Sequence, residues 1–170
     1  MHETSIRISR THFLVFTTLV VFLCAAACSS QTSQLPAAKI YAQKLVNETL
    51  AAHPEITGLE ISAASMRKDE CTTIASDEEK GIGEKCDEDE YTAMKTNKPL
   101  VDKASENGKH FYDVNVPIHD ANGKVLAIVG VDFKPDPKQT AAQASEQAQK
   151  IAKEIEAKVP TREKLYEPVS

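Results

Sequence analysis

Tryptophan is absent from this sequence, and aromatic residues make up only 5% of its 170 residues. A surface that stacks sugar rings is therefore not expected. The sequence also lacks an excess of positive charge, since its formal net charge is −5. Nucleic acid is not expected as a partner, because its binding depends on basic residues that neutralise phosphates.

Motifs that carry common chemistries are missing as well. The glycines at 81 and 83 lack the GxxxxGK[ST] spacing of a phosphate-binding loop. No CxxC or CxxCH motif is present, so neither a thiolate metal site nor a haem attachment is predicted. His110 and His119 are expected to be surface residues too far apart to share a metal. No catalytic arrangement can be placed together, so the sequence predicts no enzyme and no cofactor.

Residues 1–28 have the pattern of an export signal. Arg7 and Arg10 form a basic start, residues 13–24 are uncharged and apolar, and residues 25–27 are alanines. The apolar run is short for a membrane span. A triplet of small residues directly before Cys28 resembles the lipobox of bacterial lipoproteins, which predicts a lipid anchor on Cys28 and a place in the cell envelope. The alternatives are ordinary cleavage before Cys28, which would give a secreted protein, and an uncleaved anchor.

The remaining cysteines are predicted to form a disulfide. If Cys24 leaves with the signal and Cys28 carries lipid, Cys71 and Cys86 remain as an even pair in an oxidising compartment. Their bond would close a 16-residue loop. In the chain-entropy model such a loop contributes about 3 kcal/mol of stability.

Three helices are expected after a polar tether at 29–35. The first begins at Pro36 and ends at His53-Pro54, where proline stops a helix. Asp87 and Glu90 indicate a capping box for a short helix over about 88–96, which would turn Tyr91 towards the sheet. An amphipathic stripe rich in alanine predicts the third helix over about 138–158, packed most simply on the first. The tail, 160–170, is expected to be polar and mobile.

Alternating or continuous apolar residues predict five strands, at 59–65, 71–76, 99–105, 110–118 and 124–133. Asn107-Gly108 and Asn122-Gly123 separate the last three, which favours an antiparallel meander. The last strand is apolar on both faces and is expected in the middle of the sheet. Asp132 lies near its end. An unpaired buried carboxylate is costly, so Asp132 should lie at the rim, accept backbone hydrogen bonds or face a cation.

The order of these elements resembles that of Cache (PDC) domains, the extracytoplasmic PAS-like sensor modules. The residues that carry the resemblance are His53-Pro54, Ile74-Ala75-Ser76-Asp77 followed by Gly81-Ile82-Gly83, Tyr112-Asp113-Val114-Asn115-Val116-Pro117-Ile118, Asn122-Gly123 and Val129-Gly130-Val131-Asp132-Phe133. The resemblance implies a single Cache unit over residues 36–159. Its fold would be α+β: a PAS-like five-stranded antiparallel sheet with a long N-terminal helix, a short helix over the pocket and a C-terminal amphipathic helix.

The resemblance also implies a site and a function. In amino-acid-binding Cache domains an Asp of the last strand receives the ammonium group of the ligand, and Asp132 stands in the matching place. Asp113 and Asn115 share one face of their strand, and Tyr112 and Tyr91 complete the candidate ligand-binding residues. Two acids and an amide favour an amine or amino acid over a dicarboxylate. The alternative is that Asp113 is a surface residue and Asp132 caps the sheet edge.

The protein is therefore expected to be a sensor or solute-binding lipoprotein. No second apolar span follows Phe133, so any signal would pass to a separate protein. A second copy of this chain, bound through the last helix in a homodimer, is the other partner considered. The alternative function is an envelope structural or protein-interaction module that uses the Cache scaffold without a ligand.

Overall fold

The computed structural model describes residues 39–65, 70–106 and 109–169. The predictions for the export signal, Cys28, the tether and the start of the first helix at Pro36 lie outside these residues. Within them, every helix is too short or too polar to cross a membrane.

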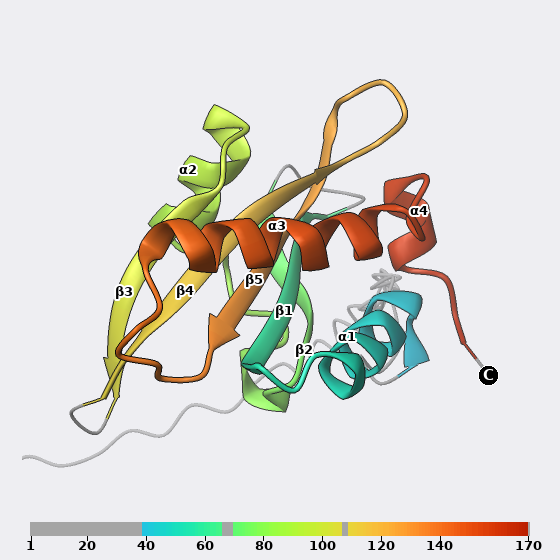
Figure 1. Cartoon of the computed structure of the whole chain (residues 1–170). Coiled ribbons are helices and arrows are strands. Elements are labelled where there is room, and N and C mark those ends of the chain that lie inside the picture. The colour runs from blue at the N-terminus through green and yellow to red at the C-terminus, as the bar shows by residue number, and fades with distance from the viewer. Residues whose placement is uncertain (1–38, 66–69, 107–108, 170) are drawn as a thin grey trace, which may run out of the picture. The chain divides into compact units, whose positions relative to one another are not determined.

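The described chain is an α+β fold built on a five-stranded antiparallel sheet with the strand order β2-β1-β5-β4-β3 (Figure 1). The elements are α1 (Tyr41–Ala52), β1 (Ile56–Ala64), β2 (Cys71–Ser76), the 3₁₀ turn η2 (Glu79–Gly81), α2 (Glu88–Thr96), β3 (Leu100–Glu106), β4 (Lys109–His119), β5 (Val125–Phe133), α3 (Ala141–Glu156) and α4 (Arg162–Leu165). The predicted PAS-like α+β fold is confirmed. β5 is the central strand, as its two apolar faces predicted.

One face of the sheet forms the core. Alternate residues such as Ile61, Val114 and Val129 point to this face and are fully buried. The helices α1 and α3 cover it with Leu45, Ile151 and other apolar residues of the same cluster. This division leaves the opposite face of the sheet for polar side chains.

The last long helix, α3, packs mainly on the sheet. Its N-terminus has a capping box between Thr140 and Gln143, and its buried stripe includes Ala148, Ile151 and Ile155. Figure 1 shows α3 running across the sheet, and its main contacts are with β4. The prediction that it packs chiefly on the first helix was therefore only partly right, because α1 lies mainly on β1 and β2.

The C-terminal tail is ordered, contrary to the expectation of a mobile segment. Leu165 of α4 is fully buried in the core. Beyond it, Pro168 forms a β-bridge with Ile40, and the amide of Tyr41 donates a 2.8 Å hydrogen bond to the carbonyl of Glu167. This bridge also explains why α1 begins only at Tyr41, since Ile40 is extended. The few apolar residues of this tail give no periodic pattern, which is why the prediction was wrong.

The short helix α2 contacts β4 and β5, and it begins with the predicted capping box. The Asp87 side chain accepts a hydrogen bond from the Glu90 amide at 2.8 Å, and the Glu90 carboxylate accepts one from the Asp87 amide at 2.9 Å. Glu90 is buried, with only 4% of its surface exposed. The cap thus fixes an acidic side chain in the interior.

Candidate functional site

Three aspartates form a row across three neighbouring strands. Asp102 of β3 is paired with Asp113 of β4, and Asp113 is paired in turn with Asp132 of β5. Directly paired residues of antiparallel strands share a face of the sheet, and like charges in such positions are destabilising. Protonation of one of these aspartates, or binding of a cation between them, would therefore reduce the repulsion and stabilise the fold.

The backbone of β1 makes room for the innermost aspartate of this row. Gly58 of β1 is paired with Asp132, and a Cβ atom at Gly58 would lie 2.6 Å from Asp132 Oδ2. Any side chain at position 58 would have to displace the carboxylate. Glycine at this position therefore lets Asp132 lie against the adjacent strand on the polar face.

A second polar position lies two residues before Asp132 on the same strand. Gly130 is paired with Glu60 of β1 on one side and with Asn115 of β4 on the other. A Cβ atom at Gly130 would lie 3.1 Å from Glu60 Oε1 and 3.3 Å from Asn115 Oδ1. The two side chains therefore converge over the glycine from opposite sides.

These groups border a pocket of about 530 Å³ on the polar face. It is lined by Thr57, Gly58, Leu59, Glu60, Ser76, Asp77, Glu78, Lys80, Gly81, Glu84, Phe111, Asp113, Gly130, Asp132 and Pro135. Of these lining residues, six carry carboxylates and one, Lys80, carries a cationic side chain. The Lys80 ammonium lies 2.9 Å from a carboxylate oxygen of Glu78. The lining is strongly acidic, and it has one aromatic ring, that of Phe111.

The environment of the pocket raises the pKa of two of its acids. The pKa of Glu60 is raised to about 8, chiefly by burial and also by the charges of Glu90, Asp113, Asp132 and Asp87. Burial likewise raises the pKa of Asp113 to about 7, with Asp132 as the leading charge. An uncharged Glu60 is therefore favoured near neutral pH until a cation compensates the charge.

Two buried oxygen atoms at this site lack a hydrogen-bond donor within the described part of the chain. They are Asn115 Oδ1 and Glu90 Oε1, in side chains that are each 4% exposed. Buried acceptors of this kind are costly unless something donates to them. Together with the raised pKa of Glu60, they indicate a position that a donor-rich group would satisfy.

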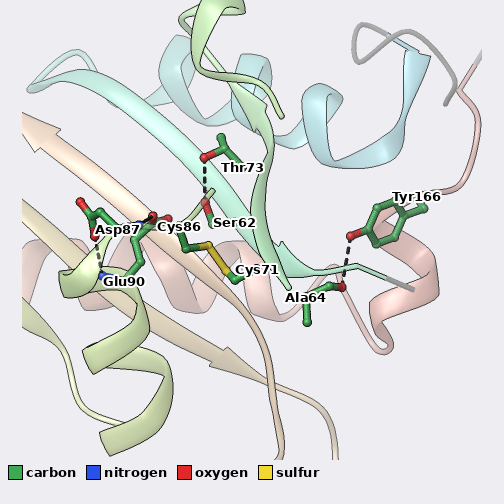
Figure 2. The surroundings of a disulfide bond; sticks show 8 residues. All are labelled: Ser62, Ala64, Cys71, Thr73, Cys86, Asp87, Glu90 and Tyr166. Carbon is green, nitrogen blue, oxygen red and sulfur yellow. Dashed lines mark hydrogen bonds between the residues drawn. A yellow bond between two sulfur atoms is a disulfide. The ribbon is translucent and has the colours of Figure 1, made fainter. Parts of the chain in front are cut away.

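A disulfide ties the acidic start of α2 to the edge of the sheet. Cys71 of β2 and Cys86 are bonded, with their Cα atoms 5.3 Å apart, which confirms the predicted pair. Figure 2 shows this bond beside Asp87 and Glu90, with the hydrogen-bonded pair of Ser62 and Thr73 nearby. Because Asp87 follows Cys86 directly, the bond also restrains the helix that carries Glu90.

Some of the predicted ligand-binding residues lie at the pocket, and others lie away from it. Asp132 and Asp113 line the pocket, and Asn115 lies beside it above Gly130. Both aspartates are half-buried, so Asp113 is not the freely exposed residue of the alternative interpretation. Tyr112 and Tyr91 are not among the lining residues. Tyr112 points to the opposite face of β4 and packs on the core, and Tyr91 is 42% exposed on α2.

Two residues at the site escaped the sequence analysis. Glu60 reads as part of the solvent face of an ordinary amphipathic strand, and only its pairing with Gly130 shows that it lies in the pocket. Phe111 was expected only as a strand residue, although it lies on the Asp113 face of β4. Alternation along β4 was the signal that could have found Phe111 instead of Tyr112.

The two histidines of β4 are also placed by the structure. His110 is exposed, as expected. His119 is half-buried instead, and its ring Nδ1 lies 3.0 Å from Glu156 Oε2, which also accepts a 2.7 Å hydrogen bond from the His119 amide. His119 therefore joins the end of β4 to the end of α3.

The carboxylates of the pocket are not arranged as a metal site. In residues 39–65, 70–106 and 109–169, no group of three or more His, Cys, Asp or Glu side chains is placed to hold a metal ion. The acids instead follow the sheet from β3 to β1.

Comparison with protein-family models finds no match, and comparison with curated proteins finds none either. Among the solved structures that resemble the chain are a reductase and a GAF domain. One is a type II free methionine-R-sulfoxide reductase from Thermoplasma acidophilum, with 12% identity, a TM-score of 0.46, and coverage of 65% of this chain and 86% of the reductase. The other is the GAF domain of an Acinetobacter phosphoenolpyruvate-protein phosphotransferase, with 13% identity, a TM-score of 0.43, and coverage of 68% and 82%.

The first of these similar structures belongs to an enzyme. That finding contradicts the expectation from the sequence that this chain is not an enzyme, so the exclusion is withdrawn. At these identities and TM-scores, neither structure assigns a reaction, a ligand or a partner to this chain. Neither is a Cache domain, so membership of that family remains a prediction.

Proposed function

We propose that this chain is a Cache-like, extracytoplasmic lipoprotein that binds a small cationic molecule, an amine or an amino acid, at Asp113 and Asp132. The observation that carries the proposal is the direct pairing of these two aspartates across β4 and β5 on the wall of the pocket. An ammonium group between them would offset the repulsion between two paired carboxylates.

The surroundings of the two aspartates favour a cation over an anion. Most charged side chains that line the pocket are acidic, so a dicarboxylate would meet like charges. Phe111 lies on the same face of β4 as Asp113 and offers a ring face, which attracts cations. A pocket of about 530 Å³ is also within the usual range for a small-molecule site.

The envelope location is part of the same proposal and rests on the sequence. The lipobox-like segment before Cys28 and the bonded pair Cys71–Cys86 both fit an oxidising compartment outside the cytoplasm. A sensor of this kind would pass its signal through a separate protein or a homodimer.

A thermal-shift screen with the full-length chain in detergent tests the proposal. The panel would contain amines, amino acids and dicarboxylates at pH 8. A ligand that binds only the native state raises the unfolding midpoint. We expect shifts from amines or amino acids and none from dicarboxylates. If no amine or amino acid shifts the midpoint, the result would support the alternative function, an envelope structural or interaction module without a ligand.

Replacing Asp132 with Asn should weaken binding of an amine found in the screen by about 1.5–3 kcal/mol, the scale of a hydrogen bond to a charged group. Isothermal titration calorimetry gives the affinity, and circular dichroism verifies the fold. Glu48→Gln is the matched control, because Glu48 is an exposed acid on α1 that faces Lys44 at 3.7 Å. Equal affinity in Asp132→Asn and Glu48→Gln would mean that Asp132 is structural.

A further inference from the structure

We infer that the pocket selects a ligand with two cationic nitrogens, a diamine or polyamine, with one nitrogen at Asp113 and Asp132 and the other at Glu60 and Asn115. This inference rests on the proposed function, since it takes the first position as an ammonium site. It adds a second position that the resemblance to Cache domains does not supply.

The pairing of the strands separates the two positions. Asp132 is paired with Asp113, whereas Glu60 and Asn115 flank Gly130, two residues earlier on β5. Residues two apart on a strand point to the same face and lie roughly 6.5–7 Å from each other. A diamine chain with bonds of about 1.5 Å between its carbons spans that distance with four or five carbons.

Unpartnered acceptors distinguish the second position from a mere cluster of acids. Asn115 is 4% exposed, and its Oδ1 has no donor among the described residues, yet it lies 3.3 Å from the same point above Gly130 that Glu60 Oε1 approaches at 3.1 Å. An amide oxygen so placed accepts hydrogen bonds and cannot donate them. It points to a donor arriving from the pocket.

The Glu90 carboxylate supplies a third acceptor near this position. Its Oε1 is buried without a donor in the described part of the chain, and its charge acts on Glu60 more strongly than that of any other acid. A primary ammonium group has three N–H donors. Glu60 and Asn115 offer two acceptors above Gly130, and Glu90 offers a further buried acceptor whose charge acts on Glu60, which suits a group rich in donors.

The rest of the pocket suits the chain between the two nitrogens. Phe111 and Pro135 line it beside Asp113 and offer apolar surface to methylene groups.

The experiment compares butylamine with 1,3-diaminopropane, 1,4-diaminobutane and 1,5-diaminopentane by calorimetry on the full-length chain in detergent at pH 8. We expect the four- or five-carbon diamine to bind at least tenfold more tightly than butylamine. Glu60→Gln should weaken the diamine much more than butylamine and so remove most of that advantage, whereas Asp132→Asn should weaken both ligands. Glu48→Gln should change neither.

The possible outcomes separate this inference from the proposed function. If butylamine binds as tightly as every diamine, or if Glu60→Gln leaves the diamine advantage intact, the second position is not a cation site and the inference is overturned. The proposed function survives both results. If amino acids bind the wild-type chain but no amine does, the inference alone is overturned. If neither amines nor amino acids bind, the proposed function falls and the inference falls with it. Glu60→Gln is not expected to unfold the chain, because it replaces a protonated acid with a neutral amide of the same shape.

Discussion

Glu60 is the residue whose environment differs most from that expected of its type. It lies on the polar face of β1 with a pKa raised to about 8 by burial and then by neighbouring acids. The unfolded chain would ionise the same group near its ordinary value. The native state therefore binds more protons than the unfolded state between these two values, and its stability falls as the pH rises through that window.

Glu60→Gln should raise the free energy of unfolding at pH 8 by about 1–2 kcal/mol. This value is smaller than the full pKa shift would give, because solvent that reaches the pocket screens the charges. The reason is that glutamine cannot ionise, so the pH-dependent loss of stability at this position disappears. Urea unfolding of the ligand-free chain at pH 5.5 and pH 8.5 measures the effect.

Glu48→Gln provides the control, since its exposed side chain on α1 should leave the pH dependence unchanged. Parallel slopes of stability against pH in wild type and Glu60→Gln would contradict a protonated Glu60.

Asp113→Asn should act in the same direction in a lower pH window that ends near pH 7, because burial and the Asp132 charge raise the pKa of Asp113 to about 7.

His53 is a second residue whose charge depends on the fold. Burial lowers the pKa of His53, but hydrogen bonds from its ring to Glu154 and Glu55 outweigh that effect and raise the pKa above its ordinary value. The two contacts, each 3.0 Å long, join the end of α1 to β1 and to α3. A histidine whose pKa is higher in the folded chain than in the unfolded chain contributes stability. This contribution is fully present below the unfolded pKa and is lost as the pH rises through the folded pKa.

His53→Gln should therefore destabilise the chain more at pH 5.5 than at pH 9, by about 0.5–1 kcal/mol, the scale of a partly exposed ion pair. Urea unfolding at the two values measures the difference. His110→Gln is the comparison, because His110 is exposed on β4. A loss of stability that is the same at both pH values would show that His53 acts through packing or neutral hydrogen bonds.

At the scale of elements, the disulfide between Cys71 and Cys86 connects β2 to the start of α2. Replacing both cysteines with serine should lower the free energy of unfolding by about 3 kcal/mol, because the unfolded chain regains the freedom of the open loop. Denaturant unfolding gives the change. A reducing agent should destabilise the wild type and leave the double variant unaffected.

Mass spectrometry of the unreduced protein provides the opposing test. Alkylation of both Cys71 and Cys86 without prior reduction would show that the bond is not formed. The same double variant should bind an amine more weakly if the bond holds α2, and with it Glu90, over the sheet.

The sequence predicted the elements well because their signals are local. Strand β2 has the predicted bounds, and β3 to β5 each agree within about one residue, since Asn-Gly turns and apolar runs mark their ends. β1 begins at Ile56, three residues before the predicted strand, because Ile56 pairs with Phe133 of β5. That pairing joins segments far apart in the chain, so no local sequence pattern predicts it.

The same distant pairing determines what could be predicted of the site. Asp113 and Asp132 lie in consecutive strands of a meander, and their proximity follows from a hairpin. Glu60 reaches the pocket only because β1 pairs with β5, across about 70 residues of sequence. Alternation alone makes Glu60 a solvent-facing residue, and it gives no sign that Gly130 leaves space for it.

At the scale of the whole molecule, the lipid anchor on Cys28 stays a prediction, since Cys28 lies outside the described residues. Cys28→Ala should move the protein from the membrane fraction to the soluble fraction of an expressing bacterial host. The physical reason is that acyl chains hold a protein on a bilayer in proportion to their buried methylene groups, and stable attachment needs more than one chain. Cell fractionation measures the location.

The matched control is Cys24→Ala, because Cys24 lies within the apolar run that is expected to leave with the signal. This variant should remain in the membrane fraction and should carry the same added lipid mass as the wild type. Equal membrane association of Cys28→Ala and wild type would contradict a lipid anchor. An uncleaved chain in both would then assign the attachment to residues 13–24, whereas a soluble wild type cut before Cys28 would make the protein a secreted one.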